Sequence, residues 1–230
     1  MNILALDTSA DVLSLSLSSP DGIRSVEIEA GPRHSESLME WVDKLFKSTG
    51  LEPEDLELVA CMKGPGSFTG LRIAYAAAKG LSMALGIPLA AIPSLDCMAY
   101  PLSIWPGIAL PVIDAKKNCF FAAFYRRGTR LSDYLDMEPR NILLHLDSYK
   151  LSREEKVVIS GPGAELFISR IETSEDRNGI FVDPLFSRGR SLELLQIVKN
   201  SYIINITEDV DSGPLYIRKS DAEIKLEPLS

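Results

Sequence analysis

The sequence has little histidine and little cysteine. His34 and His145 are the only histidines in 230 residues, which leaves few ligands for a zinc site. The three cysteines, Cys61, Cys97 and Cys119, form no C-x-x-C pair, and two of them lie in apolar runs. This pattern predicts buried thiols in a reducing compartment. We therefore expect neither a bound metal nor a disulfide.

Long apolar runs are also missing. None approaches the roughly 20 residues that a membrane-spanning helix needs. The apolar run 3–6 is too short for a signal peptide and meets Asp7 at once. We expect a cytoplasmic protein that does not contact a membrane.

Positive charge is in the minority, with 24 Lys and Arg against 32 Asp and Glu, a net charge of −8. That balance disfavours broad contact with nucleic-acid phosphates, which relies on clustered basic residues. The two dense basic stretches, 126–130 and 188–190, are short. We interpret both as solvated surface.

What is present is a regular α/β pattern. The predicted strands are 3–6, 12–18, 24–30, 56–62, 89–92, 110–114, 119–125 and 157–160, and the predicted helices are 35–48, 69–85 and 191–199. Strand 12–18 alternates leucine with serine, which predicts one dry face. A meander at the start favours two linked α/β lobes over a single parallel sheet. We expect an N-terminal lobe over 1–105, completed by the helix near 190–203, and a C-terminal lobe over 106–230 with a loose tail.

The most informative motif is a glycine-rich turn between strand 56–62 and helix 69–85. Its residues are Gly64, Pro65, Gly66, Ser67, Phe68, Thr69 and Gly70. Such a turn brings backbone N–H groups close to a phosphate or a partner. No lysine follows Gly70 as in a Walker A loop, and Pro65 removes one N–H group. Ser67 lacks the Gly-x-Ser-x-Gly pattern of a hydrolase, and Asp96 only weakly matches the acidic residue of a dinucleotide site.

A second motif, Asp7-Thr8-Ser9, follows the first strand. Its carboxylate could hold a hydrated metal ion near a phosphate. The alternative is an Asx-type turn that starts the hairpin.

Two helices carry faces that could meet a partner. Helix 35–48 has a broad apolar stripe, which comprises Leu38, Met39, Trp41, Val42, Leu45 and Phe46. Helix 69–85 carries small residues at helical spacing, among them Gly70, Ala74, Ala77 and Ala78. Small residues allow close packing, either on the protein's own sheet or against another helix, and the sequence leaves both interpretations open.

These motifs resemble the TsaB (YeaZ) family. The resemblance lies in the segments 3–9, 33–38, 63–73, 78–81, 85–88, 114–117 and 214–218, and it is densest between residues 33 and 96. It implies an ASKHA (actin/Hsp70-like) fold of two RNase H-like lobes, each a mixed sheet with helices. It also implies an accessory, non-catalytic role beside TsaD, which with TsaE and TsaC installs threonylcarbamoyl on N6 of adenosine 37 in tRNAs that read ANN codons.

The resemblance further implies how this chain meets its partners. TsaD and, for the isolated chain, a second copy would bind the helical surface that includes Leu38, Met39, Trp41, Val42, Phe46, Gly70, Ala74, Ala77 and Ala78. TsaE would associate through the complex, and tRNA only indirectly. The segment 7–10 is a degenerate phosphate loop without glycine, so we expect no nucleotide on this chain alone, with ATP or ADP held mainly by TsaD at the junction. The alternative is a nucleotide-binding or hydrolysing ASKHA enzyme, and a third class is a protease that uses Ser67.

Overall fold

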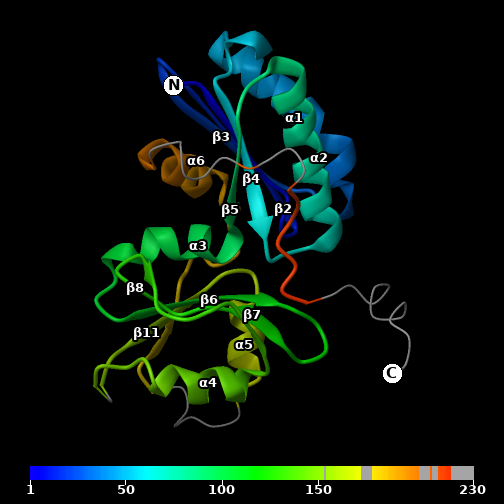
Figure 1. Cartoon of the computed structure of the whole chain (residues 1–230). Helices are drawn as coiled ribbons and strands as arrows, with labels where there is room; N and C mark the ends of the chain where they lie inside the picture. The colour runs from blue at the N-terminus through cyan, green and yellow to red at the C-terminus, as the bar shows by residue number, and fades with distance from the viewer. Residues whose placement is uncertain (153, 172–177, 202–207, 209–211, 219–230) are drawn as a thin grey trace.

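The computed structural model describes residues 1–152, 154–171, 178–201, 208 and 212–218. The strands are β1 (Ile3–Asp7), β2 (Val12–Ser19), β3 (Gly22–Glu29), β4 (Leu58–Gly64), β5 (Leu89–Pro93), β6 (Ile108–Asp114), β7 (Phe120–Ala122), β8 (Tyr125–Arg126), β9 (Thr129–Arg130), β10 (Leu135–Met137), β11 (Val157–Ser160) and β12 (Ile180–Val182). The helices are α1 (His34–Thr49), α2 (Phe68–Leu85), α3 (Ser94–Ala99), α4 (Pro139–Asp147), α5 (Ala164–Ser169) and α6 (Ser191–Asn200). They form two sheets with helices packed on their faces (Figure 1).

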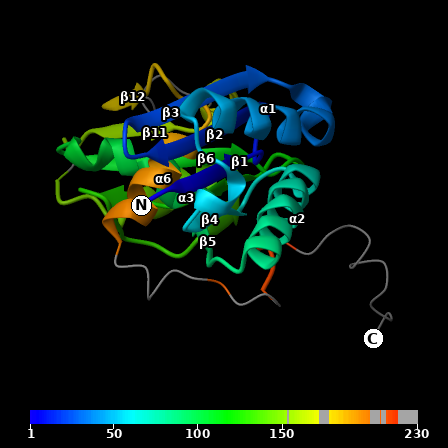
Figure 2. The same ribbon diagram turned by 90° about the horizontal axis from the view of Figure 1, so that it is seen from above.

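The first sheet has the strand order β3-β2-β1-β4-β5. The central strand β1 runs antiparallel to β2 and parallel to β4, and β5 continues the parallel side. Helices α1 and α2 cover one face, and α6 covers the other (Figure 2). We call this sheet with its helices the N-lobe.

The second sheet repeats this plan, with the path β10-β7-β6-β11-β12. Its central strand β6 pairs antiparallel with β7 and parallel with β11, which pairs parallel with β12. We call it, with α4 and α5, the C-lobe; α3 lies between the lobes (Figure 1). The repeated plan confirms the predicted two-lobed actin-like fold, while the exact residue boundary near 105 stays a prediction.

Strand β2 differs from the prediction of one dry face. Its leucines pack into the core beneath α1 and α2, as expected. Its serines are buried too, because α6 covers them: Ser14 Oγ lies 2.6 Å and Ser16 Oγ 2.8 Å from Ser191 Oγ. Both faces of β2 are therefore inside the molecule.

Both long helices end on glycine. Gly50 after α1 and Gly86 after α2 have φ of 69° and 66°, a backbone that favours glycine, and their N–H groups bond back to the last turn. Among the described residues, no helix is both long and apolar enough to cross a bilayer.

Candidate functional site

The glycine-rich turn packs against the β1–β2 turn of the same chain. The Ser67 N–H donates to the Ser9 carbonyl at 2.8 Å, and Thr8 Oγ1 donates to the Gly70 carbonyl at 2.7 Å. A Cβ at Gly66 would lie 2.7 Å from the Ser9 carbonyl oxygen, and one at Gly70 would overlap the Thr8 carbonyl. These glycines therefore allow close approach to the chain's own backbone.

Ser67 itself is the N-cap of α2. Its Oγ accepts a hydrogen bond from the Gly70 N–H at 3.2 Å. This contact gives the hydroxyl a structural task at the start of an 18-residue helix.

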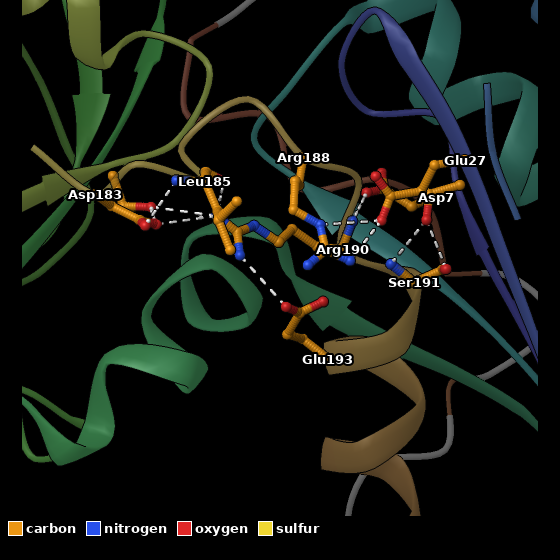
Figure 3. A network of polar contacts seen from close by, with 10 residues as sticks. Asp7, Glu27, Asp183, Leu185, Arg188, Arg190, Ser191 and Glu193 are labelled. Carbon is orange, nitrogen blue, oxygen red and sulfur yellow. Dashed lines mark hydrogen bonds and ion pairs between the residues drawn. The ribbon is translucent and has the colours of Figure 1, made fainter. Parts of the chain in front are cut away.

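The Asp7 carboxylate is buried and engaged on both oxygens. Oδ1 accepts from the N–H of Ser9 at 2.9 Å and from its hydroxyl at 2.7 Å. Oδ2 accepts from the backbone N–H of Arg190 at 2.8 Å (Figure 3). Of the two interpretations of this motif, the Asx-type turn is the one that the structure has.

The thiols and histidines do not gather into a site. Burial raises the pKa of the Cys61 and Cys97 thiols well above their ordinary value, so neither is a ready nucleophile. Within the described ranges, no three side chains of His, Cys, Asp or Glu are grouped so that they could hold a metal ion.

A buried polar network joins the two lobes at Arg190 (Figure 3). The guanidinium donates to Ser160 Oγ at 3.2 Å and to the Leu185 carbonyl at 3.1 Å, and it lies 3.4 Å from Asp183 Oδ2. On the N-lobe side it lies 3.3 Å from Glu193 Oε1 in α6. The Arg190 side chain is 3% exposed. The Arg190 guanidinium thus contacts groups from both lobes.

This network corrects the interpretation of stretch 188–190 as solvated surface. That interpretation holds for Arg188, whose side chain is 43% exposed and pairs with Glu27 at 2.9 Å. It is wrong for Arg190. Glu193 follows Arg190 at the i+3 spacing of a helical ion pair, but such pairs are common on exposed helix faces, so the sequence carried no signal of this burial.

Asp96 faces the C-lobe and not the glycine-rich turn. Its carboxylate accepts hydrogen bonds from the hydroxyls of Tyr125 and Tyr134 and lies 3.9 Å from Arg130 Nη1. Burial, and then the charge of Asp96, raises the pKa of both tyrosines, so they stay protonated donors. Its suggested part in a dinucleotide site is therefore wrong, and Asp96 ties α3 to the C-lobe.

Most of the residues predicted for a partner interface lie in the N-lobe core. The buried ones are Leu38, Val42 and Phe46 of α1, with Gly70, Ala74 and Ala78 of α2. They face the interior of the N-lobe: the two alanines serve helix-on-sheet packing, and Gly70 approaches the Thr8 carbonyl of the β1–β2 turn. We therefore correct the prediction that these six residues contact a partner, because they are covered within the N-lobe. Met39 is 50% exposed, and Trp41 and Ala77 are half-buried. That these helices meet a partner stays a prediction.

Helix α2 presents a different row of residues to solvent. This α2 outer face comprises Arg72, Ala76, Gly80, Met83 and Ala84. Met83 is 67% exposed, and open space surrounds Gly80. Small side chains at four-residue steps with an exposed methionine allow a second helix to approach closely. The outer face of α1 is mostly charged and carries the ion pairs Lys44–Glu40 and Lys47–Asp43.

Two cavities adjoin the glycine-rich turn between the lobes. One, of about 360 Å³, is lined by the turn, by residues 115–117 of the β6–β7 hairpin and by residues 215–218. The other, of about 530 Å³, reaches from the hairpin to residues 9–11. The C-terminal segment therefore closes one side of the space between the lobes.

Comparison with known proteins agrees with the fold and with the motifs. A family model described as TsaD, tRNA N6-adenosine threonylcarbamoyltransferase, matches residues 26–158, more than half of the chain. The chain is 28% identical to the tRNA threonylcarbamoyladenosine biosynthesis protein TsaB of Bacillus subtilis, over 98% of its own length and 97% of that protein. It is 32% identical to TsaB of Escherichia coli, over 55% of its own length and 56% of that protein. The solved structure of YeaZ from Pseudomonas aeruginosa has a TM-score of 0.79 at 21% identity, with coverage of 94% of this chain and 99% of that one, which shows the shared fold.

Proposed function

The chain belongs to the family that the TsaD model describes, and within it to the TsaB (YeaZ) proteins, and from this we propose that it is the non-catalytic subunit that binds and supports TsaD. It has an accessory role in the biosynthesis of threonylcarbamoyladenosine in tRNA. In the proposed complex, TsaD transfers threonylcarbamoyl to N6 of adenosine 37, and TsaE joins through the complex. We place this assembly in the cytoplasm.

The observation that carries the partner role is the α2 outer face. It lies on an ordered helix of 18 residues, yet it exposes alanine, glycine and methionine to solvent. A helix of TsaD could pack on this face with close backbone contact. A second copy of this chain would use the same face when TsaD is absent.

The Asp7 geometry supports a role without nucleotide chemistry on this chain. Both carboxylate oxygens are held by Ser9 and Arg190, and Ser9 stands where a phosphate loop of the Asp-x-Gly-Thr type would carry glycine. We propose that any ATP or ADP in the complex is held mainly by TsaD at the junction.

The test is co-purification with the cognate TsaD, with and without ATP, for wild type and for Ala76→Glu and Ala84→Glu. Each substitution places a charge on the proposed contact, Ala76→Glu within the face and Ala84→Glu at its C-terminal end, so we expect TsaD to be lost. Leu144→Glu is the matched control, because Leu144 is 62% exposed on α4 of the C-lobe. Circular dichroism on each variant would show that the fold is kept.

The possible results distinguish the proposed function from the proposed contact surface. The proposed function is contradicted if the wild-type chain does not bind TsaD and a reconstituted reaction transfers threonylcarbamoyl without it. Folded Ala76→Glu and Ala84→Glu proteins that bind TsaD as wild type does would leave the accessory role and remove the α2 outer face from it.

A further inference from the structure

Three segments that lie far apart in the sequence contact one another, and one of them is the C-terminal segment 212–218, which we call the strap. They are the strand end and glycine-rich turn at 63–72, the hairpin at 114–117, and the strap itself. In Figure 1 the strap runs from beside α2 toward the C-lobe. The proposed function does not by itself explain this convergence.

The strap is fixed to the N-lobe through its backbone. The Leu215 N–H donates to the Lys63 carbonyl at 2.6 Å, at the end of β4. Gly64 has φ of 103°, and a Cβ there would lie 2.8 Å from the Leu215 carbonyl oxygen. Just before the strap, Glu208 forms an ion pair with Lys63. The turn therefore has glycine at the point where the strap crosses it.

The strap is fixed to the C-lobe through Arg218. Its Nε donates to Asp136 Oδ2 at 2.7 Å, and its Nη2 donates to Oδ1 at 2.5 Å, the bidentate geometry of a strong pair. Its Nη1 donates to the Ala115 carbonyl at 3.0 Å. The hydrogen bond to Asp136 raises the pKa of Arg218 further above its ordinary value. The pair is partly buried, with side chains 25% and 19% exposed.

Between these two anchors, the strap builds an exposed aromatic stack on the first turn of α2. The rings of Tyr216 and Phe68 lie 5.1 Å apart, and the Arg72 guanidinium lies 3.8 Å from the centre of the Phe68 ring. Arg72 Nε donates to the Tyr216 hydroxyl at 3.2 Å. Phe68 is 39% and Tyr216 37% exposed. Because Arg72 belongs to the α2 outer face, the stack continues that face toward the C-lobe.

We infer that the strap is a positioning element that holds the first turn of α2 against the C-lobe, and that Tyr216 with Phe68 forms part of the surface that TsaD contacts. This inference rests on the proposed function. Exposed aromatic and arginine side chains dominate many protein interfaces. Holding them in place before binding lowers the cost of ordering them on binding.

The experiment measures the dissociation constant of the full-length chain with the cognate TsaD by titration calorimetry. Arg218→Gln and Asp136→Asn each remove the C-lobe anchor, and Tyr216→Ala removes the stack. We expect each to weaken binding about tenfold or more, as for the loss of one charged hydrogen-bonded contact. Tyr216→Phe keeps the ring and should stay within about threefold of wild type. Arg188→Gln is the matched control, since it removes an arginine–carboxylate pair remote from the strap.

Hydrogen exchange on the chain alone supplies a second readout. Faster exchange of the Leu215 amide and the first turn of α2 in Arg218→Gln, but not in Arg188→Gln, would support the strap as a positioning element. Unchanged exchange, or wild-type affinity for TsaD in both Arg218→Gln and Tyr216→Ala, would overturn the inference while the proposed function stands. A wild-type chain that does not bind TsaD would instead contradict the proposed function, and with it the inference that Tyr216 and Phe68 contact TsaD. Hydrogen exchange on the chain alone would still decide whether the strap positions α2.

Discussion

Arg190 and Arg188 stand two residues apart and have opposite surroundings. Arg188 forms a surface ion pair, whose measured worth in proteins is commonly about 0–1 kcal/mol. Arg190 is buried among Asp183, Glu193 and Ser160. Removal of one partner from such a buried pair leaves an uncompensated buried charge, which lowers the free energy of unfolding far more than loss of a surface ion pair does.

We therefore predict that Arg190→Met lowers the free energy of unfolding by about 3–5 kcal/mol. The control Arg188→Met should lower it by no more than about 1 kcal/mol. Guanidinium unfolding of both variants, followed by circular dichroism, measures the difference. Equal stability of the two variants would show that Arg190 is not a central tie between the lobes.

Ser67 can be tested in the same way, and its test separates a cap from a nucleophile. Ser67→Ala removes the N-cap of α2 and should cost about 1 kcal/mol of stability, with threonylcarbamoyl transfer in a reconstituted reaction unchanged. Ser67→Asp keeps a capping oxygen without a hydroxyl, and should restore most of that stability. Loss of transfer in both folded variants would instead favour chemistry at Ser67.

At the scale of elements, α2 has two faces of small residues with different tasks. The inner face, with Ala74 and Ala78, is fully buried against the sheet. The outer face, with Ala76 and Gly80, is exposed. A periodicity of three and four residues runs along both, so spacing does not say which one is covered.

Two glycines of α2 give a matched comparison. Gly70→Ala would push a methyl group into the Thr8 carbonyl, and we expect a loss of about 3 kcal/mol, the upper end for overpacking. Gly80→Ala meets open space and should stabilise the helix by about 0.5–1 kcal/mol. Denaturant titration of the two variants checks whether the free energy of unfolding falls in Gly70→Ala and rises in Gly80→Ala. A neutral Gly70→Ala would mean that the turn does not need its close approach.

Many elements could be predicted from the sequence, down to the four-residue strand β11, and others, including the nine-residue helix α4, could not. The helices at α1, α2 and α6 and the N-lobe strands follow from clear periodicity. Helix α5 has six residues and β12 has three, too few for a period to show. The serines of β2 were predicted only as the other side of an alternating strand. Their burial depends on α6, which lies more than 170 residues further along the chain.

At the scale of the whole molecule, polar ties among the described residues join the lobes, and they include Arg190 with Asp183, Asp96 with Tyr125, and Arg218 with Asp136. They lie on segments that pass between the lobes or bridge them. Such ties favour one fixed arrangement of the lobes, as suits the proposed role in support of TsaD.

The whole molecule also decides what the Asp7-Thr8-Ser9 turn can do. We predict that calorimetry of the isolated chain with ATP or ADP shows no submillimolar binding, because Asp7 is engaged within the chain. Binding that is detected and then lost in Gly66→Val would contradict the accessory role and favour a nucleotide-binding enzyme. The comparison must use the chain without TsaD.

The sequence by itself determined the fold class, the long elements and the family, because periodicity and contiguous motifs are local properties of the chain. Only the tertiary structure decided which apolar and charged residues are covered. Arg190 was indistinguishable from a surface arginine, Ala74 from Ala76, and the motif at 214–218 had no assigned task. Burial depends on segments distant in sequence: α6 on β2, the C-lobe around Arg190, and the strap across the glycine-rich turn. Those contacts form only when the chain folds and brings these distant segments together.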